Sequence, residues 1–113
     1  MKLVRKARRK AFKVGANCIV YEYRMADKDI NGALAKLYGR HPVKGYVVNK
    51  KCKELVYVIK GKGKIVFEDK EVKLAEGDVA LIGAGEKYYW NGNMLIFIPC
   101  TPAWYPKQHV MVR

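Results

Sequence analysis

The sequence predicts an all-β domain, and three features of its 113 residues support that prediction. Short apolar stretches alternate with turn-forming residues roughly every 8–12 positions, which is the spacing of a β-sandwich or barrel. No stretch keeps the apolar periodicity of a helix for longer than about two turns. Half of the residues are apolar, which is enough for one core, and a chain of this length forms one domain.

The first strands are predicted from alternation and from the glycines that bound them. Residues 18–24 carry tyrosines at alternate positions, as a half-buried strand does. The next stretch, 30–38, is open to two interpretations, because its apolar centre suits a helix or a strand. Gly32 near its start and Gly39 after its end favour a strand of ordinary length.

The later strands are separated by breaks whose residues tolerate positive φ or cap a turn. Gly61-Lys62-Gly63 is interpreted as a hairpin turn between two strands. A dinucleotide-binding fingerprint would need glycine in place of Val66, and a phosphate-binding loop would need serine or threonine in place of Ile65. The predicted later strands are 45–49, 54–60, 64–68, 71–74, 79–83, 88–90 and 94–99, with turns at 69–70, 75–78, 83–85 and 91–93.

The net charge of +13 is concentrated at the start of the chain. The first thirteen residues hold seven lysines and arginines, and no acid precedes Glu22. We therefore predict a basic N-terminal segment or edge strand over 1–17 and a single barrel domain over 18–113. The basic segment could bind nucleic-acid phosphates. It could equally be a solvated arm, or an edge strand whose charges prevent unwanted pairing.

Composition excludes some functions and indicates a compartment. The chain has no serine and a single threonine, so Ser-His-Asp catalysis is excluded. Its three cysteines are scattered, which favours reduced thiols in the cytoplasm. The longest apolar run, 94–100, is far shorter than a membrane span, and no secretory signal follows Met1. We expect a cytoplasmic protein with no membrane partner.

Two spaced motifs resemble those of the cupin superfamily, over 39–102. Glu54 and Gly61 keep the spacing of the second half of the family's first motif. Gly77 and Gly85 keep the spacing of its second motif. The resemblance implies a double-stranded β-helix, or jelly roll, with a small-molecule pocket inside. It also implies a homodimer, because single-domain cupins commonly pair barrel against barrel.

The resemblance fails at the metal ligands. Typical metal cupins use three histidines and a glutamate, and only Glu54 remains here. Tyr88 stands where the second motif has its histidine. One carboxylate cannot form a transition-metal site, so we predict no metal and no cofactor. His41 and His109 lie too far from the motif positions to be assigned as substitutes. Counted back from Glu54, the two missing histidines of the first motif fall at Val47 and Asn49, or at Val48 and Lys50.

A carboxylate inside a barrel needs partners or a proton, because desolvating it unpaired is costly. One hypothesis is a cluster of Glu54, Tyr88 and Lys50 at the former metal position. The alternative is that Glu54 points outward and pairs with a surface lysine. Aromatic side chains could line a site for a ring or sugar, or simply fill the core. The candidate ligand-binding residues are Glu54, Tyr88, Trp90, Lys50 and Tyr46.

The favoured function is a small metal-independent cupin-like protein that binds a small organic ligand, with catalysis left open. One alternative is a nucleic-acid-associated protein that uses the basic N-terminal segment. Another is a metal-free sugar isomerase or epimerase, with Tyr88 as acid and Glu54 or Lys50 as base. Neither the ligand nor a reaction follows from the sequence.

Overall fold

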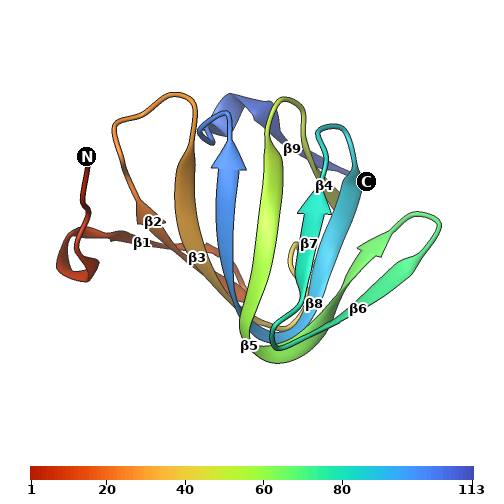
Figure 1. Cartoon of the computed structure of the whole chain (residues 1–113). Coiled ribbons are helices and arrows are strands. Elements are labelled where there is room, and N and C mark those ends of the chain that lie inside the picture. The colour runs from red at the N-terminus through yellow and green to blue at the C-terminus, as the bar shows by residue number, and fades with distance from the viewer.

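The computed structural model describes all 113 residues and confirms the all-β prediction (Figure 1). Two short 3-10 turns, η1 (Lys6–Arg8) and η2 (Pro106–Gln108), accompany the strands. No helix has the length and apolarity needed to cross a membrane. The strands are β1 (Lys10–Gly15), β2 (Cys18–Tyr23), β3 (Asn31–Tyr38), β4 (Tyr46–Asn49), β5 (Lys53–Phe67), β6 (Glu71–Ala75), β7 (Val79–Ile82), β8 (Lys87–Thr101) and β9 (His109–Val112).

The strands form two facing walls that share the long strands β5 and β8 (Figure 1). All pairings are antiparallel. In the first wall the order is β1-β2-β3-β8-β5-β7, built on the first half of β5 and the second half of β8. In the second wall the order is β6-β5-β8-β4-β9, built on the other halves. Because both long strands bend together, the sheet curls around one interior.

The predicted hairpin turn at 61–63 and the predicted turn at 91–93 are both wrong, because each segment continues a long strand. These glycines instead let the backbones of β5 and β8 approach each other closely. A Cβ added to Gly63 would lie 2.6 Å from the carbonyl oxygen of Asn91, and one added to Gly92 would collide with Gly63 Cα. Gly61 and Gly92 also have φ of +87° and +137°, and residues with a side chain rarely adopt these angles. Glycine thus lets β5 and β8 bend while staying paired.

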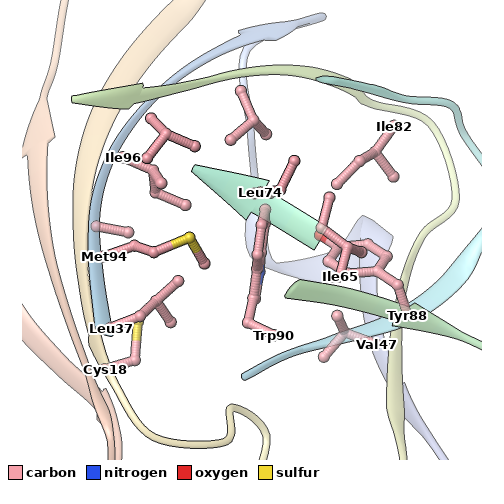
Figure 2. Close-up of a cluster of buried hydrophobic side chains, with 13 residues drawn as sticks. Cys18, Leu37, Val47, Ile65, Leu74, Ile82, Tyr88, Trp90, Met94 and Ile96 are labelled. Carbon is pink, nitrogen blue, oxygen red and sulfur yellow. The ribbon is translucent and has the colours of Figure 1, made fainter. Parts of the chain in front are cut away.

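The interior is packed with apolar side chains that alternate along the strands (Figure 2). Trp90 lies between the two walls, with Met94 and Leu37 on one side and Ile65 on the other. Burying each large aliphatic side chain stabilises the fold by roughly 1.5–3 kcal/mol. The interior is therefore mostly a core. The buried cluster consists of Cys18, Ala35, Leu37, Val47, Val56, Val58, Ile65, Leu74, Ile82, Tyr88, Trp90, Met94 and Ile96.

The two ends of the chain form edge strands. β1, which lies within the predicted basic segment 1–17, pairs with β2. Arg9 precedes β1, and its guanidinium lies 4.0 Å above the ring of Tyr21 and donates to the Tyr23 hydroxyl at 3.2 Å. Nucleic-acid binding by this segment stays a prediction. β9 was not predicted, since its four residues give too short a pattern, but it pairs with β4 and helps to form the site described next.

Candidate functional site: a buried carboxyl cluster

Polar side chains gather where β4, β5, β8 and β9 meet at one end of the barrel. Glu54 lies in β5 directly opposite Ile82 and Cys100, which are both buried, so its side chain faces the interior. Asn49, the last residue of β4, lies opposite His109, the first of β9. The Glu54 side chain therefore does not point outward, which removes the surface alternative.

One carboxyl oxygen of Glu54 accepts two hydrogen bonds. The Tyr88 hydroxyl donates to Oε1 at 2.7 Å, and the Asn49 amide nitrogen donates to the same atom at 2.9 Å. The amide oxygen of Asn49 is then left to face the other way. It accepts from the Gln108 side chain at 2.9 Å and contacts His109 Nδ1 at 2.8 Å. These residues form one connected network, which we call the carboxyl cluster.

The other carboxyl oxygen of Glu54, Oε2, has no partner within the protein. Every fully buried side-chain nitrogen or oxygen in the protein does have a hydrogen-bond partner. Oε2 is therefore not completely enclosed, although the residue as a whole is only 9% exposed. Glu54 thus presents one anchored oxygen and one accessible oxygen.

Burial sets the protonation of this carboxyl. Desolvation raises the pKa of Glu54, and the hydrogen bonds from Tyr88 and Asn49 only partly oppose that rise. Burial likewise raises the pKa of Tyr88, and the adjacent Glu54 raises it further. The cluster thus favours a protonated carboxyl and a neutral phenol, and in the acid form Oε2 is where the proton would sit.

Two histidines lie near the cluster. Because the Asn49 amide oxygen faces His109, Nδ1 of that ring carries the hydrogen, and Nε2 is left with a free lone pair. His41 forms a bridge with Trp90 through two backbone hydrogen bonds, so both side chains point inward. Burial lowers the pKa of both imidazoles, and the charge of His109 further lowers the pKa of His41. Both rings are thus held toward their neutral, basic form.

Two thiols complete the surroundings of Glu54. Cys52 and Cys100 are buried and free, and the Cys100 thiol donates to the carbonyl oxygen of Pro102 at 3.4 Å. Desolvation raises the pKa of both thiols. They therefore stay protonated and act as small apolar walls.

The residues at the metal position of typical cupins do not fit a transition metal. The interior-facing positions of β4 are Val47 and Asn49, which offer a hydrocarbon and a neutral amide. Tyr88 offers a phenol whose burial disfavours the phenolate. Glu54 alone is a ligand of the usual kind. Nowhere in the chain do three histidine, cysteine, aspartate or glutamate side chains gather as a metal site requires.

The structure brings together three of the five candidate residues. Glu54 and Tyr88 are hydrogen-bonded, and the Trp90 indole packs edge-on against the Tyr88 ring with centroids 5.6 Å apart. Lys50 is exposed, and Asn49 takes the place beside Glu54 that was expected for it. Tyr46 alternates with inward-facing Val47, so it lies on the outer side of β4 against Tyr89.

Sequence reasoning missed four residues of this region, which are Asn49, Gln108, His109 and His41. Asn49 was within reach, because it occupies one of the two registers counted back from Glu54. Gln108 and His109 lie in η2 and the unpredicted β9, where no motif signals a role. His41 was set aside because it lies outside the motif spacing, yet its bridge to Trp90 turns it inward.

Comparison with known proteins supports the fold. No protein-family model matches the sequence, and no curated protein matches it. Among solved structures, Pac13 of Streptomyces, a nucleoside dehydratase, is 15% identical with a TM-score of 0.89, covering 100% of this chain and 92% of its own. Variants of that protein with a histidine or a tyrosine replaced are similar too, and these contain uridine.

Two further structures extend the comparison. The polyketide cyclase RemF of Streptomyces resistomycificus is 15% identical with a TM-score of 0.76, covering 100% of this chain and 86% of its own. An RmlC-like cupin of Shewanella frigidimarina is 14% identical with a TM-score of 0.71, covering 89% and 90%. The fold is thus the cupin jelly roll that the two sequence motifs implied.

Proposed function

We propose that this cupin-fold chain binds a small, hydroxylated organic molecule at the carboxyl cluster and transfers protons to and from it without a metal. The observation that carries this proposal is the accessible Oε2 of Glu54. It belongs to a carboxyl whose pKa is raised by burial and whose other oxygen is anchored by Tyr88 and Asn49. Such a group donates a proton, or a hydrogen bond, to a ligand oxygen.

The base in this scheme is an imidazole. His109 is held by Asn49 in the tautomer that leaves Nε2 free, and the lowered pKa keeps that nitrogen unprotonated near neutral pH. His41 also faces the interior in neutral form. The alternative of a sugar isomerase with Glu54 or Lys50 as base fits less well. Burial favours the acid form of Glu54, and Lys50 is exposed.

The reaction class that best suits this pair is elimination of water. A base takes a proton from carbon, the electrons of that C–H bond form a carbon–carbon double bond, and the C–O bond breaks. The acid protonates the departing hydroxyl, which leaves as water. One structural neighbour is a nucleoside dehydratase whose variants contain uridine, a ring-containing molecule, which supports a ring-containing ligand here. Tyr88 and Trp90 are 2% and 5% exposed, so they belong to the core behind this site and leave little ring surface for a ligand.

Titration with uridine, followed by NMR, tests the binding part of the proposal. We expect the signals of Glu54, Tyr88 and Trp90 to shift. Glu54→Ala should weaken the affinity about two- to tenfold, because one hydrogen bond between neutral groups contributes roughly 0.5–1.5 kcal/mol. Glu71→Ala, which removes an exposed carboxylate of β6, should leave the affinity unchanged. Shifts confined to residues outside the carboxyl cluster would contradict the proposal.

We also propose that two copies pair through the outer face of the first wall, in the cytoplasm. Exposed apolar side chains line up there across neighbouring strands: Val79 lies opposite Tyr57, Tyr57 opposite Phe97, and Phe97 opposite Leu34. Val79, Tyr57 and Phe97 are 59%, 44% and 39% exposed. An apolar row of this length on one face supports burial against a second copy.

A further inference from the structure

The loop between β4 and β5 is fixed by a single buried side chain. Gln108, which is 2% exposed, accepts hydrogen bonds through its Oε1 from the backbone N–H groups of Lys51 at 3.3 Å and Cys52 at 3.2 Å. Its backbone carbonyl accepts from the N–H of Lys50 at 2.8 Å. Three consecutive residues of the loop are therefore held by one glutamine, which makes the loop a rigid feature of the barrel end.

Lysines are concentrated on and beside this loop. Lys50 and Lys51 are exposed in the loop, Lys107 is exposed in η2 next to Gln108, and Lys53 is exposed at the start of β5 on the outer side, opposite to Glu54. None of the four forms an ion pair, since the ion pairs of the protein involve Arg24, Lys64 and Lys87. We call these four residues the lysine rim.

Two acids of the neighbouring loops, Asp27 and Glu86, are hydrogen-bonded to backbone N–H groups. The Asp27 carboxylate accepts from the backbone N–H groups of Asp29 and Ile30, at 2.8 and 3.2 Å. The Glu86 carboxylate accepts from the N–H of Gly83 at 2.7 Å. These carboxylates keep their charge, but none forms an ion pair with the lysine rim, so the four ammonium groups stay free to attract anions.

The loop that carries Lys50 and Lys51 is connected to the carboxyl cluster through its backbone. Gln108 holds the loop through its Oε1 and donates through its Nε2 to Asn49, which in turn donates to Glu54. The buried part of this network contains no lysine or arginine, so an anionic group would lose its hydration there without compensation. At the rim, an anionic group can stay partly hydrated and meet several ammonium groups.

We propose that the lysine rim binds an anionic group, such as a phosphate or carboxylate, of the same molecule whose uncharged part reaches Glu54. This inference rests on the proposed function and narrows its ligand to anionic small molecules. The rim binds the charged end, the carboxyl cluster binds the hydroxylated end, and Gln108 keeps the two at a fixed separation.

Inorganic phosphate, followed by NMR and calorimetry at low salt, tests the rim by itself. A variant with Lys50→Gln, Lys51→Gln and Lys53→Gln should lose at least fivefold in phosphate affinity. The matched control, with Lys60→Gln, Lys62→Gln and Lys73→Gln, removes the same charge from exposed strand positions elsewhere and should retain it. Acetate in a parallel titration shows whether a carboxylate binds as well as a phosphate.

The outcomes separate the two proposals. Phosphate binding that is absent from the natural protein, or lost equally in both triple variants, would overturn the lysine rim. Phosphate binding that depends on the rim, together with no shift of the Glu54 signals by uridine or by its 5′-phosphate, would keep an anion site at the rim and reject the proposed function. Glu54→Gln should leave phosphate affinity unchanged, because it alters no charge at the rim.

Discussion

At the scale of single residues, Glu54 determines what the site can do. Its carboxyl is anchored on one oxygen and accessible on the other, and burial favours its protonated form. Tyr88 donates one of the two hydrogen bonds to the anchored oxygen. Asn49 donates the other and connects the carboxyl to His109 and Gln108. The chemistry of the site therefore depends on neutral groups that exchange protons, and no fixed charge is needed inside the barrel.

The first prediction concerns stability against pH. The pKa of Glu54 is raised in the folded state, so the folded protein holds this proton more tightly than the unfolded chain does. The resulting stability is complete below the unfolded pKa, about 4.3 for glutamate. It is lost as pH rises through the folded pKa. Glu54→Gln mimics the protonated form, and its amide oxygen can still accept from Tyr88 and Asn49.

Urea unfolding at a series of pH values checks this prediction. The free energy of unfolding of the natural protein, minus that of Glu54→Gln, should fall as pH rises from about 4 upward. The lowered pKa values of His41 and His109 act in the opposite direction, since that stability is lost as pH falls below the ordinary imidazole range. Their effect is common to both proteins and largely cancels. A difference that rises with pH would show that the folded carboxyl prefers to be charged.

The second prediction concerns Tyr88→Phe. This change removes a buried hydroxyl that donates to Glu54 at 2.7 Å and keeps the ring that packs against Trp90. Unfolding by urea should require about 0.5–1.5 kcal/mol less free energy, because Glu54 Oε1 loses one of its two donors and keeps the one from Asn49. The pKa of Glu54 should rise further, since that hydrogen bond lowers it in the natural protein. A Phe variant of unchanged stability and unchanged Glu54 titration would contradict the network.

At the scale of elements, η2 and the short strand β9 position the site. They bring Gln108 and His109 to the end of β4, although neither element was expected from the sequence. Gln108→Ala should expose the N–H groups of Lys51 and Cys52, which lose their acceptor. Hydrogen exchange at these two amides should accelerate far more than at the core amides of β5. Unchanged protection of the loop would mean that other groups hold it.

The strands illustrate which features of a sequence are informative. Alternation and turn residues located β2, β3, β4, β6 and β7, because each is short and is flanked by turn residues. The long strands β5 and β8 were split in two, because glycine in a turn and glycine at a close contact look the same in sequence. Gly63 and Gly92 differ from turn glycines only in packing across the sheet, which no local pattern contains.

The site was predictable to a similar degree. Motif spacing identified Glu54 and Tyr88, and strand alternation put Trp90 on the same side as Tyr88. Lys50 was placed beside Glu54 because two registers of the first motif relative to β4 were possible. In the structure Asn49 is buried, so the register that turns Asn49 inward is the correct one. Contacts between distant segments, such as Asn49 with His109, arise only from folding and have no local signal.

At the scale of the whole molecule, the apolar outer face of the first wall and the net charge of +13 have opposite effects on the association of two copies. Apolar contact favours a dimer, whereas like charges on two copies repel. We predict that light scattering after gel filtration gives a dimer whose affinity increases with salt, because salt screens the repulsion. Phe97→Glu should give a monomer, and Met111→Glu, on exposed β9, should stay dimeric. Equal behaviour of both variants would reject this face as the interface.

The most direct test of a metal-free acid at the centre of this barrel is the titration of the Glu54 carboxyl carbon, followed by NMR in protein treated with a chelator. Its midpoint should lie above the ordinary glutamate value of about 4.3 and should not change when zinc, iron or manganese is added. A midpoint at or below that value, or one that falls when a metal is added, would show that Glu54 is a charged ligand rather than a buried acid.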